Sequence, residues 1–396
     1  MIKFQKAADV IKRNGMRQGG KIVAGHAMTF LKSFIVGSGD ILYITGGVGD
    51  SAMYRTRNVA EELRNHGFRA SATVLGNPIL PSLVDKFKIF VFHRTAFDGN
   101  VPRIIKKIKS LEKEIIFDTD DLIFDPKYLS QVEYYKNAGS FERKRYENGV
   151  GREIVEDPYV ATATASTRYL AKKLEEKGKK TFIVRNKLSE REIKLADHVL
   201  ATRAKIADER VCIGYFSGTP SHDKDLATIT DALAEVLRKY PNARIIFAGP
   251  VKKDSRLDEF NDRIGVLPRV SRDDYYDNLF KIDINLAPLE IGSPFCEAKS
   301  EIKFIEAGIL KIPTVAVRNG TFSEAIEDGE NGMLAATKEE WVEKIGKLIE
   351  DAELRKEMGE NARSKVLRKY TTKSEGNEEF YGYLKEKIER FAARAK

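Results

Sequence analysis

The chain has 396 residues, of which 42% are hydrophobic, and a chain of this size is expected to form two cores rather than one. Its formal net charge of +9 favours an anionic partner such as a nucleotide diphosphate or an acidic membrane surface, whereas no helix-turn-helix, RRM, KH or zinc-finger pattern supports binding to nucleic acid. Two distant cysteines, Cys212 and Cys296, and five histidines are too few for a disulfide framework or a structural zinc site, so we expect free thiols.

The first forty residues form a basic segment in which apolar side chains are interleaved with charges. Its only acids are Asp9 and Asp40, and its bases are Lys3, Lys6, Lys12, Arg13, Arg17, Lys21 and Lys32. Such a segment is typical of an amphipathic stretch that lies on anionic lipid, and an ordinary solvated extension is the alternative. No run reaches the roughly 18 apolar residues of a membrane-spanning helix, and no secretory signal is recognisable. We therefore predict a cytoplasmic protein, and the basic segment leaves open a peripheral contact with the inner face of the cell membrane.

From residue 41, short apolar runs alternate with longer amphipathic ones. The candidate strands of the first half are Ile41–Thr45, Ala70–Leu75, Ile89–His93, Ile115–Asp118, Tyr159–Thr164 and Phe182–Arg185. The helical patterns between them include Arg55–His66, Pro102–Lys113 and Ser166–Lys177. Strands that alternate with helices predict a parallel sheet with right-handed crossovers.

The same alternation restarts after a polar stretch at residues 205–210. The strands expected there are Val211–Phe216, Ala243–Ala248, Ile284–Leu286 and Thr314–Val317, and the helices are Asp225–Lys239, Asp273–Phe280 and Ser300–Ile309. After residue 338 the chain is helical and charged, and a long helix runs from about Ser374 to Arg394. We therefore predict an α/β protein with a basic extension, two doubly wound Rossmann-like domains, and a C-terminal helix that packs back on the first domain. The boundaries are 1–39, 40–205, 206–373 and 374–396.

The most informative segment, Ser293–Gly308, follows the strand Ile284–Leu286 as a turn-rich loop and then opens a helix. Backbone N–H groups and the positive end of that helix suit a diphosphate, to which Lys299 and Ser300 add a charge and a hydroxyl donor. Glu306 lies about two turns further on, where its carboxylate can accept both hydroxyls of a ribose. A surface amphipathic helix that carries acids and lysines by chance is the alternative.

This segment resembles the signature of retaining glycosyltransferases of family 4, which have the GT-B fold. That signature has two glutamates separated by seven residues, then a short helix, a small residue and Pro-x-Val-Ala. Glu306 and Ile312-Pro313-Thr314-Val315-Ala316 match its second half, whereas eight residues separate Glu297 from Glu306 and the matching position holds Ala298. The order Phe-x-x-x-Lys-Ser-x-x-Lys-x-x-Glu resembles a subgroup of bacterial surface-polysaccharide transferases.

Three further segments resemble the same family: a strand–loop–helix, an Asp-Gly-x-x-Gly turn and a helix near the C-terminus, at residues 213–225, 325–332 and 352–370. Many members carry an arginine and a lysine in the first of these loops, and the arginine is absent here. The resemblance implies that Gly218 and Thr219 supply backbone contacts to the donor and that Lys224 or Lys299 supplies the missing charge.

In the first half, a glycine-rich loop, Thr45–Ser51, follows the first strand. Family members use this loop beside the acceptor and the donor phosphates, which implies that Gly47, Ser51 and Arg55 lie on the acceptor side; a tight turn that needs glycine is the alternative. His93-Arg94 ends another strand at its carboxyl end. His93 can hydrogen-bond the transferred sugar there, and an ordinary loop histidine is the alternative.

Asp118, Asp120 and Asp121 place three carboxylates within four residues at a strand end. Oxygen ligands of this kind can hold a divalent metal, and Asp-x-Asp is the metal motif of the other large transferase fold. Because the second half already offers a donor site, we assign these residues to the acceptor side or to shaping the cleft and predict no metal site. Asp121 alternatively caps the following turn.

The resemblance implies a GT-B enzyme whose two domains face a cleft. It would move a sugar from a nucleotide-diphosphate sugar to a glycan or lipid-linked acceptor with retention, with no obligatory cofactor. Glu297, Lys299 and His93 would be catalytic, and residues 249–250 and 269–270 would lie near the base. A sugar-nucleotide epimerase or hydrolase of the same fold and a non-catalytic partner in glycan assembly are the alternatives.

Overall fold

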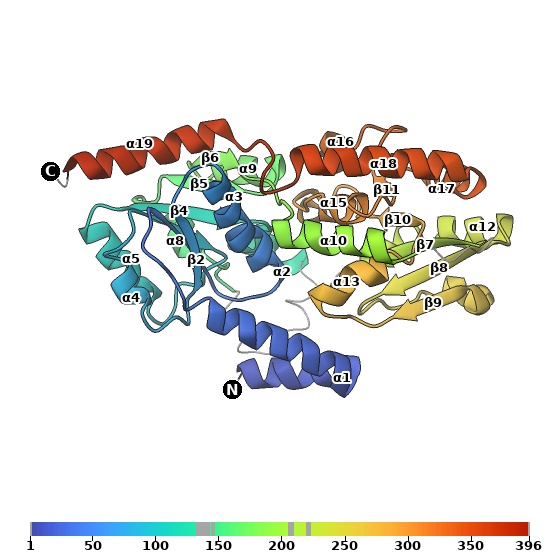
Figure 1. Ribbon diagram of the computed structural model, residues 1–396, viewed down its shortest axis with the longest axis horizontal. Coiled ribbons are helices and arrows are strands. Elements are labelled where there is room, and N and C mark those ends of the chain that lie inside the picture. Colours follow the sequence, from blue (N-terminus) through green and yellow to red (C-terminus); the bar gives the residue numbers. More distant parts are fainter. Residues whose placement is uncertain (1, 132–142, 144–146, 205–209, 219–222, 395–396) are drawn as a thin grey trace. The chain divides into compact units, whose positions relative to one another are not determined.

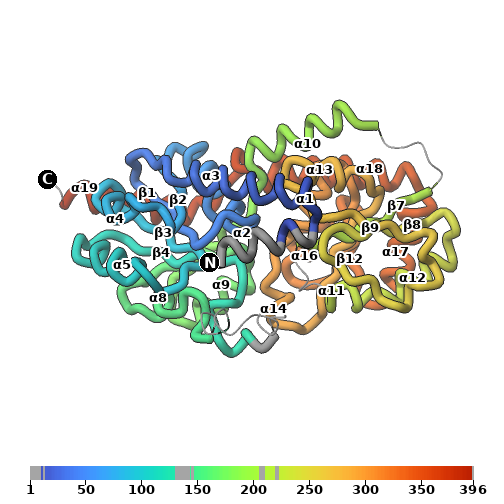
Figure 2. The backbone as a smooth tube through the Cα atoms, turned by 90° about the horizontal axis from the view of Figure 1, so that it is seen from below, coloured from blue at the N-terminus to red at the C-terminus, as the bar shows by residue number. Residues whose placement is uncertain are grey.

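The computed structural model of the protein describes residues 2–131, 143, 147–204, 210–218 and 223–394. The chain divides into two compact units, and each is described by itself. The N-terminal unit comprises residues 26–189, 298–300 and 370–396, and the C-terminal unit comprises residues 1–25, 190–297 and 301–369. Figure 2 traces this path, in which the chain leaves the N-terminal unit near residue 190 and returns to it near residue 370.

A six-stranded sheet of order β2-β1-β3-β4-β5-β6 forms the centre of the N-terminal unit, and every pair of neighbouring strands is parallel (Figure 1). The strands are β1 (Ile41–Thr45), β2 (Ala70–Val74), β3 (Ile89–His93), β4 (Glu114–Thr119), β5 (Thr162–Ala165) and β6 (Lys180–Ile183). Strands β1 and β3 are buried at every residue, as expected from their mostly apolar sequences when a parallel sheet is covered on both faces.

The helices of this unit are α2 (Asp50–Ala52), η1 (Met53–Asn58), α3 (Val59–Asn65), α4 (Leu80–Leu83), α5 (Val101–Ser110), η2 (Leu122–Phe124), η3 (Pro126–Gln131), α8 (Arg152–Glu156), α9 (Arg168–Glu175) and α19 (Glu378–Arg394). α5 shows why they form, because its buried residues recur at helical spacing: Val101, Ile104, Ile105 and Ile108. α19 belongs to the same core, in which its residues Phe380, Tyr381 and Leu384 join Ile41 and Tyr43 of β1.

The C-terminal unit contains a second parallel sheet, of order β12-β11-β10-β7-β8-β9. Its strands are β7 (Val211–Phe216), β8 (Ala243–Ala248), β9 (Ile264–Leu267), β10 (Ile284–Ala287), β11 (Thr314–Val317) and β12 (Met333–Ala335). Its helices are α10 (Glu190–Thr202), α11 (Asp223–Ala227), α12 (Thr230–Lys239), η5 (Ser255–Arg263), α13 (Arg272–Leu279), α14 (Pro294–Glu297), α15 (Ile302–Gly308), α16 (Gly320–Ala325), α17 (Lys338–Glu350) and α18 (Ala352–Lys369).

In each sheet the strand order reverses once, between β1 and β3 in the N-terminal unit and between β7 and β10 in the C-terminal unit. Open α/β sheets bind ligands outside the carboxyl ends of the strands at this switch point. The prediction of two doubly wound parallel sheets with a helical C-terminus is confirmed. β9, β12 and α10 were not predicted, and the helix predicted at Arg55–His66 begins earlier, at Asp50, and consists of α2, η1 and α3.

The basic segment before β1 is largely one helix, α1 (Ile2–Lys32), which is bent at Gly15, where φ is 74°. Gly19 permits a close approach after the bend, because a Cβ there would lie 2.6 Å from Cα of Ile11. Of the helices in the described parts of the chain, α1 included, none is both long and apolar enough to cross a membrane.

Candidate functional site

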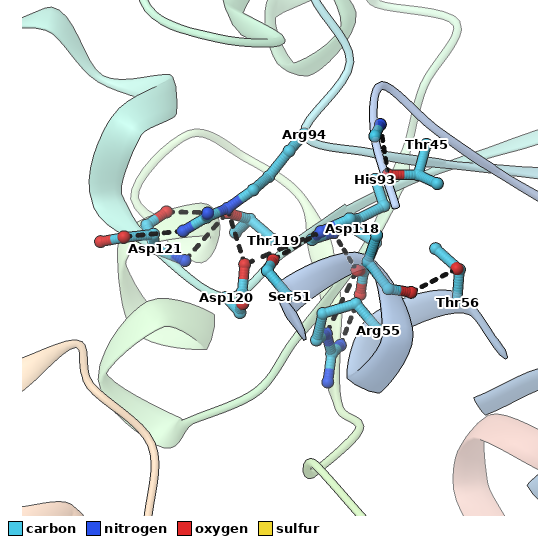
Figure 3. Close-up of polar contacts among 12 residues, drawn as sticks. Thr45, Ser51, Arg55, Thr56, His93, Arg94, Asp118, Thr119, Asp120 and Asp121 are labelled. Atoms are coloured by element: carbon cyan, nitrogen blue, oxygen red, sulfur yellow. Dashed lines mark hydrogen bonds and ion pairs between the residues drawn. The ribbon is translucent and has the colours of Figure 1, made fainter. Parts of the chain in front are cut away.

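Polar side chains meet at the carboxyl ends of β1, β3 and β4 in the N-terminal unit (Figure 3). His93 ends β3 and pairs in register with Asp118 of β4, while Ser51 lies in α2, directly after the loop that follows β1. The Ser51 hydroxyl is 3.0 Å from His93 Nε2, and His93 Nδ1 is 2.8 Å from Asp118 Oδ2. Because a carboxylate only accepts hydrogen bonds, Nδ1 of His93 donates to Asp118, and Nε2 is left to exchange a hydrogen bond with the Ser51 hydroxyl.

Arg55 contacts Asp118 from η1, a π-helix of the kind that often occurs at functional sites, and its side chain is fully buried. Its guanidinium donates to both carboxylate oxygens of Asp118, to the carbonyl of Val184 and to Oδ1 of Asn186. Burial by itself raises the pKa of Asp118, but Arg55 and His93 outweigh this effect and hold the pKa below its ordinary range. Asp118 is therefore a fixed anion that orients His93, and Arg55, which was predicted on the acceptor side, acts through Asp118.

A second ion-pair group surrounds Arg94, whose backbone φ is 43°. Its Nε is 2.7 Å from Asp120 Oδ1, and its Nη2 donates to Asp121 Oδ2 at 2.6 Å. Lys299 Nζ lies 3.3 Å from the same Asp121 oxygen. The other oxygen of Asp121 accepts from the backbone N–H of Leu122 at 3.0 Å, so Asp121 does cap the turn that follows it.

The three aspartates thus face cations of the protein itself. Burial raises the pKa of Asp120, but Arg94, His93 and Arg55 more than offset this, and its pKa is lowered. Within the described residues, no group of three or more histidine, cysteine, aspartate or glutamate side chains is arranged to hold a metal ion. The carboxylates of this cluster are partnered by arginine, lysine and histidine instead.

The loop after β1 is open on one side. Gly47 is exposed, and a Cβ there would have no atom within 4 Å, so the loop has room for a bound molecule. None of its three glycines has a φ in the left-handed region, so a strained turn does not account for them.

Residues 298–300 also belong to this unit, where Asn186 Nδ2 donates to the Ser300 hydroxyl at 3.0 Å.

In the C-terminal unit, Glu306 lies on α15 and is 6% exposed. Its Oε1 is 2.7 Å from Arg272 Nη1, and its Oε2 accepts from the Tyr275 hydroxyl at 2.7 Å. The Arg272 guanidinium also pairs with Glu192 and lies 4.8 Å from the centre of the Tyr275 ring. Both oxygens of the Glu306 carboxylate are therefore held by donors of α13.

The remaining predicted residues occupy different positions. Gly218 is exposed two residues after β7, Lys224 is exposed on α11, and Thr219 lies outside the described residues. Glu297 ends α14 as a half-buried side chain, and its carboxylate has no hydrogen-bond or ion-pair partner in the described parts of the chain. Sequence inspection missed the polar side chains that hold the predicted residues in place, namely Thr164, Asn186, Arg272 and Tyr275.

Comparison with known proteins gives a family match for the C-terminal unit. Residues 203–365 match the model of the family described as glycosyl transferases group 1. No curated protein matches the sequence. HepE from Anabaena, solved in complex with UDP and glucose, superposes with a TM-score of 0.57 at 15% identity over 88% of this chain and 100% of that chain. The fold is GT-B.

Two further GT-B neighbours superpose equally well. Sucrose-phosphate synthase from Thermosynechococcus elongatus has a TM-score of 0.56 at 12% identity, over 90% of this chain and 100% of its own. A glycosyltransferase from Rickettsia africae has a TM-score of 0.56 at 14% identity, over 89% of this chain and 99% of its own. At these identities the likeness concerns the GT-B fold, which confirms the predicted fold class, and the chemistry has to be argued from this chain's own residues.

Proposed function

We propose that this protein is a glycosyltransferase that moves a sugar from a nucleotide-diphosphate sugar to a glycan or lipid-linked acceptor, with retention of configuration, in surface-polysaccharide or glycoconjugate synthesis. The observation that carries the proposal is the group 1 family match, because it covers the sheet with the β7–β10 switch point and the helix that carries Glu306. HepE, which has a similar fold, was solved with UDP and glucose, so a UDP-sugar is the first donor to test.

On the donor side, Glu306, whose carboxylate is oriented by Arg272 and Tyr275, is proposed to accept the ribose hydroxyls. Gly218, Thr219, Lys224, Lys299 and Ser300 are the proposed diphosphate ligands. Charge develops on the departing diphosphate in the transition state, so preorganised donors at that group contribute most to the rate. In this proposal these groups stabilise the leaving diphosphate, and no metal ion is obligatory.

On the acceptor side, the geometry of His93 gives it a defined task. Its Nε2 is hydrogen-bonded to the Ser51 hydroxyl, and a sugar hydroxyl can take the place of that hydroxyl. Glu297, whose carboxylate is unpartnered in the described chain, is proposed to accept a hydroxyl of the transferred sugar. Gly47, Arg94, Asp120 and Asp121 are proposed to line the acceptor side. The acceptor hydroxyl then gives its proton to the leaving phosphate on the same face, which accounts for retention.

The test of the function begins with a thermal-shift panel of UDP-, GDP- and dTDP-sugars. The true donor is expected to stabilise the protein by about 2.7 kcal/mol when present at a hundred times its Kd. With that donor and a glycan or lipid-linked acceptor, NMR of the product is expected to show the anomeric configuration of the donor. Conversion of the donor without an acceptor would indicate an epimerase or hydrolase, and binding without turnover would indicate a non-catalytic partner.

We further propose that the protein works in the cytoplasm at the inner face of an anionic membrane, through the basic segment before β1. Residues 10–39 contain five lysines and arginines and no acid. Met28 and Leu31 lie one turn apart on α1 with 58% and 62% of each side chain exposed, and Ile35 follows one turn later at 85%. An apolar stripe beside basic residues suits the interface of an anionic bilayer.

A vesicle assay tests this location. The variant M28S/L31S/I35S is expected to bind vesicles of phosphatidylcholine mixed with phosphatidylglycerol at least about tenfold more weakly than the wild type, since it loses three apolar anchors. The control I79S/L111S/V266S removes three exposed apolar side chains elsewhere and is expected to bind like the wild type. Added salt should weaken wild-type binding. Equal sedimentation of the two triple variants would contradict the proposal.

A further inference from the structure

Lys303 places an ammonium group at the switch point of the C-terminal sheet. It lies in the first turn of α15, the helix that follows β10, and its Nζ donates to the carbonyl of Phe216, the last residue of β7. Nζ is also 4.5 Å from the centre of the Tyr215 ring. β7 and β10 are the neighbours between which the strand order reverses, so Lys303 connects the two strand ends where a sheet of this kind binds its ligand.

The charge of Lys303 is poorly compensated. Its ammonium forms no ion pair with a carboxylate in the described parts of the chain; its partners are one carbonyl and one ring face. The half-buried Arg272, by contrast, pairs with Glu192 and Glu306. Desolvation lowers the pKa of Lys303 to about 8, with Asp225 and Glu306 opposing the shift at longer range. A half-buried cation without an ion-pair partner is destabilised by its partial desolvation, and a bound anion would reduce that cost.

We propose that Lys303 is the principal cation that binds the donor diphosphate in the C-terminal unit, at the carboxyl end of β7. This inference rests on the proposed function, because it requires a nucleotide-diphosphate donor. Lys299, which was predicted together with Lys224 as a source of this charge, lies 3.3 Å from Asp121 in the N-terminal unit, so its charge is already matched by a carboxylate. Lys303 offers the donor a charge that no carboxylate of the described chain has taken.

The site has a pH signature. The groups that face the Lys303 ammonium are Tyr215 of β7, Asp225 of α11 and Glu306 of its own helix. A diphosphate stabilises the protonated amine, so its pKa is higher in the complex than in the free protein. Affinity is therefore complete below pH 8 and falls by up to tenfold per pH unit above it. The terminal phosphate of a nucleoside diphosphate has a pKa near 6 and is already ionised in this range.

Calorimetric titration with UDP, GDP and dTDP at pH 7 and pH 9 tests the proposal. K303M is expected to weaken binding of whichever nucleotide the wild type prefers by about 10- to 100-fold at pH 7, because it removes a hydrogen bond from a charged donor. K303R keeps the charge at both pH values and is expected to lose the fall in affinity between them. K347M, which removes an exposed lysine of α17, is the matched control and should bind like the wild type.

The outcomes distinguish a failure of the proposed function from a failure of the role of Lys303. If the folded wild type binds none of the three nucleotides, the proposed function fails, and the role of Lys303 fails with it. If the wild type binds one of them and K303M binds it as tightly as K347M does, the function stands and the role of Lys303 is wrong. If the affinity of the wild type and that of K303R fall equally between pH 7 and pH 9, the fall arises from the nucleotide, and the role of Lys303 is wrong.

Discussion

Glu306→Gln is expected to lower kcat/KM for the identified donor by about 10- to 100-fold, because a neutral amide replaces a charged acceptor for the ribose hydroxyls. The side chain keeps its shape, and Arg272 keeps its ion pair with Glu192, so the unit should remain folded. Steady-state kinetics with the donor found in the thermal-shift panel measure the loss. Glu306→Ala is expected to lose at least as much.

A donor without the ribose 2′-hydroxyl shows whether this loss arises at the ribose. With the wild type, the modified donor should show much of the loss in kcat/KM that E306Q shows with the natural donor. On E306Q the same modification should cost little more, because the two changes remove one interaction. If the two losses multiply independently, Glu306 does not contact that hydroxyl, and its contacts with Arg272 and Tyr275 would account for its effect.

Arg55→Met is expected to destabilise the N-terminal unit by about 3–5 kcal/mol, because it leaves Asp118 as a buried anion whose remaining partners are His93 and Thr164. In the wild type, the lowered pKa of Asp118 gives stability that is present above the ordinary aspartate pKa and is lost as the pH falls. In R55M the sign reverses, since a buried aspartate without its arginine has a raised pKa. The deficit should therefore be larger at pH 7 than at pH 4.5 in urea denaturation followed by circular dichroism.

Two comparisons make this result specific. R55M/D118N removes both charges and should recover part of the lost stability, whereas additive losses would show that the ion pair does not couple the two positions. R238M removes an exposed ion pair with Glu259 and should change stability by less than about 1 kcal/mol. The single tryptophan, Trp341, lies in α17 of the C-terminal unit, so its fluorescence should change less in R55M than the circular dichroism does.

The sequence predicted most strands, because long apolar runs with helical segments between them leave few alternatives. Its failures have physical causes. β9 lies at a sheet edge with the half-exposed pattern of Ile264–Leu267, and β12 has three residues, so neither produces a clear period. η1 was not predicted because the spacing of apolar residues does not show where the hydrogen bonds of an α-helix change to those of a π-helix.

The candidate site was predicted residue by residue but not as a constellation. Ser51, His93 and Asp118 each follow or end a strand, which the sequence indicates, yet their hydrogen bonds depend on β1, β3 and β4 being neighbours in register. Local sequence patterns do not reveal the order of the strands in a sheet. The partners of Glu306 could not be predicted either. A buried carboxylate requires hydrogen-bond donors, but nothing in the sequence singles out Arg272 and Tyr275 among the many basic residues and tyrosines.

The place of α19 has a consequence for how the chain folds during synthesis. Phe380, Tyr381 and Leu384 complete a core that begins with Ile41 on β1, so the unit synthesised first cannot close until a segment more than three hundred residues later has left the ribosome. The intervening C-terminal unit, residues 190–297 and 301–369, needs no such wait. The usual order, in which the N-terminal domain folds first, should therefore be reversed here, and nascent chains should expose an unfinished apolar surface to chaperones until synthesis passes residue 384.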